Sequence, residues 1–305
     1  MAMRTTKRCL LQKSFASAAQ NNKPTGQTLS DAFDGAGLLI PHTAAVKAMS
    51  IPNNNRDTCV VMTLCSRPDY TRKVLDALAR CDDVDKFPIA LLCEPVSDEV
   101  ISVAAEFTKL PHVHAFVMVG QQQVGCNVNT YSALAYGFDH HTRVIALEDD
   151  TVPGRDFLRF MDWGLGRYAR DASVFSVCGY QRTPREETGY RNSVIREPWF
   201  TPWGWGTWRD RWESIRDSWP ADDKQVSWDT VIDKLTRRGR CEVRPMLARI
   251  QNIGAEGGAH VPGAAWHAEH HLNRYWIEST PGPRVDEWAE VAPVITKALR
   301  AHHPC

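Results

Sequence analysis

The chain has 305 residues, 43% of them hydrophobic and 24% charged, which is enough apolar material for one large or two fused globular domains. Lys plus Arg equals Asp plus Glu at 36 each, so the overall charge points neither to nucleic-acid coating nor to an anionic membrane. The nine cysteines form no CxxC pair and fall largely within apolar runs, which excludes an obvious disulfide framework and indicates small core residues in a reducing cytosol.

Residues 1–55 are the least patterned part of the chain. Polar stretches at 20–26 and 52–56 bracket a weakly apolar region, which predicts an arm on the main fold or an extension, without an assigned function. The basic N-terminus is followed by an apolar run too short for a secretion signal, and no window approaches the length of a membrane span. We therefore expect a soluble, cytoplasmic protein.

From Thr58 onward the chain alternates between strand and helix patterns. This alternation predicts an α/β fold, with a Rossmann-like, mainly parallel sheet flanked by helices. Ligands of such sheets bind beyond the C-terminal ends of the strands, where Arg67, Glu94, Asn127 and Asn129 are expected to lie. The predicted strands are 59–65, 88–94, 114–119, 143–148 and 173–178, and the predicted helices are 70–80, 98–109, 129–138 and 156–168.

Three consecutive acids, Glu148, Asp149 and Asp150, end the strand at 143–148. Unit charges about 4 Å apart repel by roughly 4 kcal/mol at an effective dielectric near 20, so the triplet needs a cation or divergent side chains. A hard divalent metal would meet that need, whereas a solvated acidic turn that caps the next helix is the simpler alternative. No GxGxxG follows the first strand and no GxxxxGK[ST] occurs, so neither a dinucleotide site nor a P-loop is supported.

Arg67 precedes Pro68, which favours the first position of a helix. Its guanidinium would then lie at a helix N-terminus, where anions bind well, and a base or a phosphate is the expected partner. A solvated turn residue is the competing interpretation.

Residues 199–219 hold six of the eleven tryptophans. Trp203 and Trp205 alternate with glycines and suit stacking against sugars or bases, while the other four are expected in the core, with Trp208 and Trp212 on a helix. Further on, Asp229 lies at the start of an amphipathic helix, as an N-terminal helix charge or as a carboxylate held for proton abstraction.

In combination these motifs resemble a GT-A fold glycosyltransferase, and most closely the N-acetylglucosaminyltransferase I family with its bacterial and viral relatives. The resemblance spans roughly residues 57–280, with motifs in the family's order. Glu94 stands where the family usually has a uracil-contacting Asp, and Asn129 where it has a donor-contacting His. The matching pieces are Arg67, Glu94, 129–134, 144–157, 202–205, Trp228 with Asp229, 238–245 and 251–260.

The resemblance implies an inverting transfer of a hexosyl or N-acetylhexosaminyl group from a UDP-sugar to an acceptor hydroxyl, with Mn2+ or Mg2+ as cofactor. It implies that Asp150 binds the metal and that Asp229 is the catalytic base. Trp203, Trp205 and His260 are expected to contact the acceptor or the sugar. The implied donor contacts are Arg67, Glu94, Asn129, Glu148, Asp149 and Trp228.

Residues 56–180 would then form the nucleotide-sugar-binding domain, 181–280 the acceptor-side subdomain with the base, and 281–305 a tail. The acceptor stays open between a glycan, a lipid-linked glycan, a protein and a hydroxylated DNA base, in a bacterial or virus-infected cell.

Three alternatives belong to other classes. A nucleotidyltransferase would also use clustered acids on an α/β sheet, and a non-catalytic carbohydrate-binding protein would keep the tryptophans. A zinc hydrolase would use His260, His267, His270 and His271, but His267-Ala-Glu-His-His271 does not match HExxH, so a polar helix face is favoured.

Overall fold

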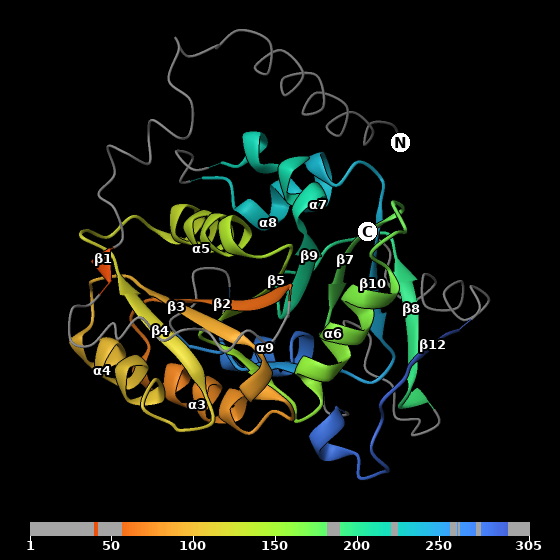
Figure 1. The fold of residues 1–305 in the computed structure, drawn as a ribbon, viewed down its shortest axis with the longest axis horizontal. Helices are drawn as coiled ribbons and strands as arrows, with labels where there is room; N and C mark the ends of the chain where they lie inside the picture. Colours follow the sequence, from red (N-terminus) through yellow and green to blue (C-terminus); the bar gives the residue numbers. More distant parts are fainter. Residues whose placement is uncertain are drawn as a thin grey trace, which may run out of the picture. The chain divides into compact units, whose positions relative to one another are not determined.

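A ten-stranded mixed sheet flanked by helices forms the centre of the computed structural model (Figure 1). The structure describes residues 40–41, 57–181, 190–220, 225–256, 261, 263–272 and 276–291. The predicted arm at 1–55 therefore lies almost entirely outside the described residues. The strands are β1 (Ile40–Pro41), β2 (Thr58–Leu64), β3 (Pro88–Cys93), β4 (His114–Val119), β5 (Arg143–Glu148), β6 (Thr151–Pro153), β7 (Val174–Cys178), β8 (Ser193–Glu197), β9 (Trp205–Trp208), β10 (Cys241–Pro245), β11 (Ile250–Asn252) and β12 (Ala289–Glu290).

The helices begin and end close to the predicted positions. Pro68 occupies the first turn of its helix, and Ser97 caps the next one by accepting a hydrogen bond from the Val100 amide at 3.3 Å. The helices are α3 (Pro68–Ala79), α4 (Asp98–Phe107), α5 (Cys126–His140), α6 (Phe157–Arg167), α7 (Arg209–Glu213), α8 (Trp228–Val231) and α9 (Ala264–His270), with 3-10 turns at Val84–Lys86, Arg216–Ser218 and Ile277–Ser279 and a π-helical turn at Ile232–Thr236.

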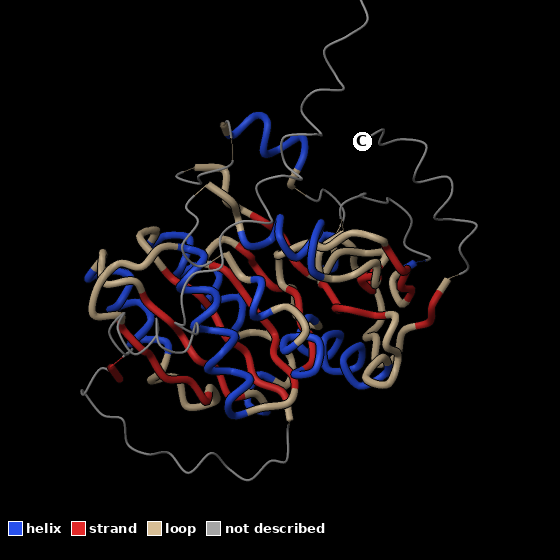
Figure 2. The backbone as a smooth tube through the Cα atoms, turned by 90° about the horizontal axis from the view of Figure 1, so that it is seen from above, coloured by secondary structure: helices blue, strands red, loops and turns tan. Residues whose placement is uncertain are grey.

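The sheet order is β1-β4-β3-β2-β5-β9-β7-β10-β8-β12. Strands β4, β3, β2 and β5 are mutually parallel, as predicted from the alternation of strands and helices. The side chains of β2, β3 and β5 are mostly apolar and buried, because helices cover both faces, whereas most of those of β4 are half-buried. Figure 2 shows the strands side by side with helices lying over them.

The chain reverses its direction of travel across the sheet between β2 and β5. Helices α3 and α4 cover one face while the chain proceeds from β2 to β3 and β4, and α5 lies on the other face on the way back to β5 (Figure 1). In open α/β sheets such a reversal marks the crevice at the strand ends where ligands bind, and here it lies at the ends of β2 and β5, where Thr63 pairs with Glu148.

Strand β9 is the main departure from the expected topology. It lies antiparallel between β5 and β7, so the predicted fifth parallel strand is not the direct neighbour of the fourth. Gly206 is needed there, since a Cβ at this position would meet the Val144 carbonyl oxygen at 2.9 Å. Trp208 ends this strand, so the prediction that it shares a helix with Trp212 is wrong.

The second half of the chain contributes to the same sheet through β8, β10 and β12, and a two-stranded sheet joins β11 to β6. The boundary predicted near residue 180 therefore falls within a continuous sheet, and the division into donor and acceptor regions stays a prediction. None of the described helices is long and apolar enough to cross a membrane.

Candidate functional site

The crevice brings the end of β2 next to the end of β5. Thr63 and Glu148 are register partners, so Arg67 and the acidic triplet emerge side by side. The predicted juxtaposition of these residues is therefore present in the fold.

Arg67 is held against the acids by its position before Pro68. Its backbone is not helical, with φ of −115° and ψ of 79°, and the side chain turns towards the triplet. Nη2 donates to Oδ1 of Asp149 and, at 2.8 Å, to Oδ2 of Asp150, while Nε donates to the second oxygen of Asp149 at 3.4 Å. Burial lowers the pKa of Arg67, but the two carboxylates more than offset this, and the net shift is upward.

The three acids differ in environment. Asp149 is only 5% exposed, and burial raises its pKa although Arg67 acts in the opposite direction. The pKa of Glu148 lies well above its usual range because of burial and because Asp150, Asp149 and Asp229 add negative charge around it. The crevice therefore has a deficit of positive charge that Arg67 alone does not remove.

The two carboxylate oxygens of Asp150 differ in their contacts. Its Oδ2 accepts from Arg67, but its Oδ1 is buried without a hydrogen-bond partner. Gly254 lies directly over the same carboxylate, since a Cβ there would meet Oδ2 at 2.3 Å. Among the residues that the structure describes, no three His, Cys, Asp or Glu side chains gather to hold a metal. An unpartnered carboxylate oxygen is a ligand of the kind that suits a hard divalent ion.

Glu94 forms hydrogen bonds with the loop that precedes α5. The residue is 3% exposed, and its two carboxylate oxygens accept from the backbone amides of Val124 and Gly125, at 2.9 and 2.8 Å. Burial raises its pKa although these amides counteract the shift. The predicted base contact through Glu94 stays a prediction, and the structure adds that its carboxylate already anchors the loop before α5.

Asn129 lies in the first turns of α5 and is 5% exposed. Its amide faces the sheet, with Nδ2 at 3.5 Å from the Leu92 carbonyl oxygen. Its predicted donor contact stays untested. The nearby Asn127 makes more contacts than the sequence indicated.

Trp228, the residue before Asp229, lines the same small cavity as Glu148. Asp229 is the second residue of α8 and is half-buried, and its Oδ1 is buried without a hydrogen-bond partner. No side-chain hydrogen bond caps α8 at its N-cap Ser227. The negative charge of Asp229 helps to raise the pKa of Glu148, so the two carboxyl groups share one site.

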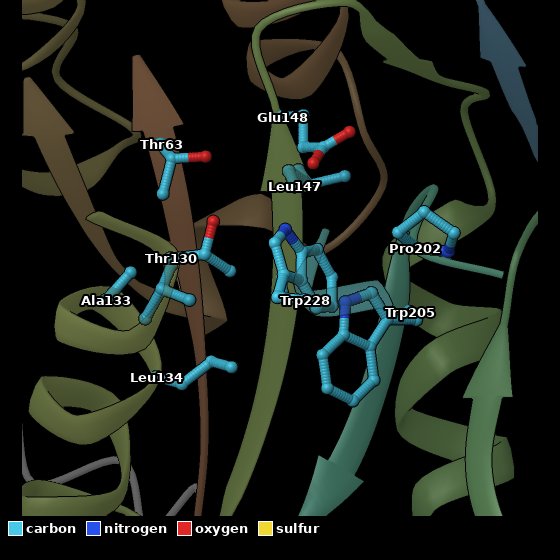
Figure 3. Close-up of a pocket in the computed structure, with 11 residues that line it drawn as sticks. Thr63, Thr130, Ala133, Leu134, Leu147, Glu148, Pro202, Trp205 and Trp228 are labelled. Atoms are coloured by element: carbon cyan, nitrogen blue, oxygen red, sulfur yellow. The ribbon is translucent and has the colours of Figure 1, made fainter. Parts of the chain in front are cut away.

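A small cavity separates Trp228 from the sheet, with room for about one water-sized group. In Figure 3, Glu148 lies at the end of β5, and Trp205 and Trp228 lie close together beside that strand. Thr130 and Leu134 of α5 line the other wall. Trp228 is 2% exposed, so its ring acts mainly as packing and presents almost no surface to a ligand.

Trp203 and Trp205 lie in different environments although only one residue separates them. Trp205 is 1% exposed and stacks on Phe175 and Trp228, so a ligand would reach it only through the small cavity. Trp203 is half-buried and packs edge-on against Tyr180. Of the two, Trp203 is the one that the fold leaves open to an acceptor, and its role stays a prediction.

The histidines considered for zinc do not form a cluster in the described part of the chain. His267 is buried and its Nε2 lies 2.8 Å from Oδ1 of Asn252, while Nδ1 of His270 lies 2.8 Å from the Trp266 carbonyl oxygen. His260 lies outside the described residues. The preference for a polar helix face over a zinc site stays a prediction.

No protein-family model matches the sequence, and no curated protein matches it. Among solved structures, the mannosyltransferase PcManGT from Pyrobaculum calidifontis in complex with GDP-Man and Mn2+ aligns at 16% identity and a TM-score of 0.45, over 77% of this chain and 61% of that one. S. aureus TarS aligns at 10% identity and a TM-score of 0.45, over 63% of this chain and 36% of that one. TarS 1–349 in complex with UDP-GlcNAc aligns at 10% identity and a TM-score of 0.44, over 63% of this chain and 57% of that one. The chain thus spans less than two thirds of each of these structures.

Proposed function

We propose that the chain is a metal-dependent glycosyltransferase that moves a sugar from a nucleoside diphosphate donor, with UDP-sugars as the first candidates, to an acceptor hydroxyl with inversion. The observation that carries the proposal is a pair of buried, unpartnered carboxylate oxygens, Oδ1 of Asp150 and Oδ1 of Asp229. Both acids lie close enough to Glu148 to raise its pKa. A buried oxygen without a partner costs about 1 to 3 kcal/mol per group, so a bound metal at one and an acceptor hydroxyl at the other would stabilise both.

Asp150 would hold the metal through Oδ1, with Gly254 leaving room beside the carboxylate. A divalent ion bound there supplies positive charge to the diphosphate as it leaves. Arg67, at the N-terminus of α3, would keep the carboxylates of Asp149 and Asp150 in place through its hydrogen bonds to them. Asp149 and Glu148 would contact hydroxyl groups of the donor.

Asp229 would accept the proton of the acceptor hydroxyl through its unpartnered oxygen. As the acceptor oxygen attacks the anomeric carbon, the bond from that carbon to the diphosphate breaks, and the configuration inverts.

A donor panel tests the proposal. Purified protein is incubated with UDP- and GDP-sugars, with Mn2+ or with EDTA, and free nucleoside diphosphate is measured. We expect nucleoside diphosphate release that requires Mn2+ or Mg2+. Pyrophosphate release would instead identify a nucleotidyltransferase, and sugar binding without any nucleotide release would identify a carbohydrate-binding protein.

A further inference from the structure

Asn127 connects the start of α5 to the segment that carries Asp229. It is the second residue of the helix and is half-buried. Its side-chain nitrogen donates to the carbonyl oxygens of Pro220 and Val226, each at 2.9 Å, and its side-chain oxygen accepts from the Trp228 amide at 3.2 Å. One amide group therefore engages both its donor and its acceptor atoms in the same segment.

The backbone of Asn127 adds a further link. Its carbonyl oxygen accepts a hydrogen bond from Nε1 of Trp219 at 2.8 Å. The Trp219 ring stacks on that of Trp228, with centroids 5.2 Å apart and planes 11° from parallel. The first residue of α8 is thus fixed through both its amide and its ring, and Asp229 is the next residue.

We propose that Asn127 is the positioning residue of the proposed catalytic base, and that it sets where the Asp229 carboxylate lies relative to the acidic triplet. The catalytic part of this inference rests on the proposed function. The position requires an amide, since Asp would place a carboxylate against the carbonyl oxygens of Pro220 and Val226, and Ala would reach none of the three partners.

The first test separates positioning from donor binding. In Asn127→Ala we expect the maximal rate of transfer to fall about 10- to 100-fold, because a base displaced by about 1 Å loses that much, while donor affinity stays within about twofold. The control is Ser132→Ala on the same helix, which removes only the hydrogen bond from Ser132 to the Val128 carbonyl oxygen. This control should transfer at the wild-type rate.

A double-mutant cycle then tests whether Asn127 acts through Asp229. If it does, Asn127→Ala combined with Asp229→Asn transfers no more slowly than Asp229→Asn alone. If Asn127 only supports the fold, the two losses multiply. If the two losses in transfer rate multiply, or if Asn127→Ala transfers at the wild-type rate, the positioning role is wrong. The proposed function would remain intact in either case.

Hydrogen exchange supplies a readout that does not need activity. We expect at least about tenfold faster amide exchange in a peptide covering residues 225–231 in Asn127→Ala than in Ser132→Ala. Unchanged exchange there would remove the structural basis of the inference. If the wild-type protein turns over no donor in the panel, the proposed function is wrong. Failure of the positioning role and failure of the proposed function therefore appear in different measurements.

Discussion

Oδ2 of Asp150 accepts a hydrogen bond from Nη2 of Arg67 at 2.8 Å, whereas Oδ1 of the same carboxylate is buried without a partner. One side of Asp150 is thus satisfied by a permanent cation of the protein, and the other side has no hydrogen-bond partner. In the proposed function this second side binds the metal. This assignment predicts what the loss of Asp150 would change.

Asp150→Asn should reduce donor affinity in Mn2+ to the level measured in EDTA. The amide is a poorer ligand for a hard cation, while Arg67 keeps its contacts with Asp149 and the repulsion within the triplet decreases, so the melting temperature should change little. Calorimetric titration with UDP, with and without Mn2+, measures this difference. Asp217→Asn changes the same charge on a side chain that is 91% exposed and serves as the control. Unchanged Mn2+-dependent affinity in Asp150→Asn would remove the metal assignment.

Asp229→Asn should lower the rate of transfer by about 10² to 10⁴, the usual contribution of a general base, with donor affinity near wild type. Asn preserves the shape of the side chain and is also acceptable at a helix start, so the melting temperature should stay within a few degrees. Single-turnover kinetics measure the rate of transfer, and calorimetric titration measures the donor affinity. Transfer within a few-fold of wild type would return Asp229 to a structural role.

Gly254→Ala should weaken Mn2+-dependent donor binding by about tenfold, or about 1.4 kcal/mol. The added methyl group would lie 2.3 Å from Oδ2 of Asp150, so the carboxylate or the loop after β11 must move. The matched control is Gly166→Ala, where a Cβ meets only the Arg143 side chain at 3.7 Å. Titration of both variants with donor decides the matter, and equal affinities would show that Gly254 does not shape the site.

His267 predicts a dependence of stability on pH. Burial lowers its pKa below the ordinary value, so the neutral ring is favoured in the folded state. The stability associated with this neutral ring is fully present above the unfolded pKa near 6.5, and it is lost as pH falls through the lower folded pKa. The loss is at most about 1.4 kcal/mol per pH unit within that window.

The measurement is urea unfolding of wild type and His267→Gln between pH 7 and pH 5. The wild type should lose stability over this range relative to the variant, whose amide keeps a donor towards Asn252. Parallel pH profiles for the two proteins would show that His267 does not titrate with unfolding.

The half of the fold that contains β2 to β5 could be predicted because local patterns decide it. Strands β2, β3, β4 and β5 are short apolar runs between helices with clear start signals, and parallel pairing follows from the alternation. Arg67 and Asp150 could likewise be placed on one edge, because parallel strands end together.

The rest depended on contacts that leave no local signal. Strand β9 consists of only four residues, and its Trp-Gly-Thr-Trp sequence is equally typical of a ligand surface, so its insertion beside β5 was not predicted. Asn127 reaches residues more than ninety positions away, and Gly254 is notable only for how close it lies to Asp150. Such roles are set by three-dimensional proximity rather than by spacing along the chain.

The place of β9 also has a consequence for synthesis of the chain. The outer edge of β5 has its hydrogen-bonding groups unpaired until residues 205–208 leave the ribosome, and β7, although made earlier, has no position in the sheet until then. At about 5 to 20 residues per second, this delay lasts several seconds. During that time a nascent chain exposes an apolar strand edge to its neighbours on the same polysome. Translation speed across residues 149–208 should therefore influence how much of the protein is recovered folded.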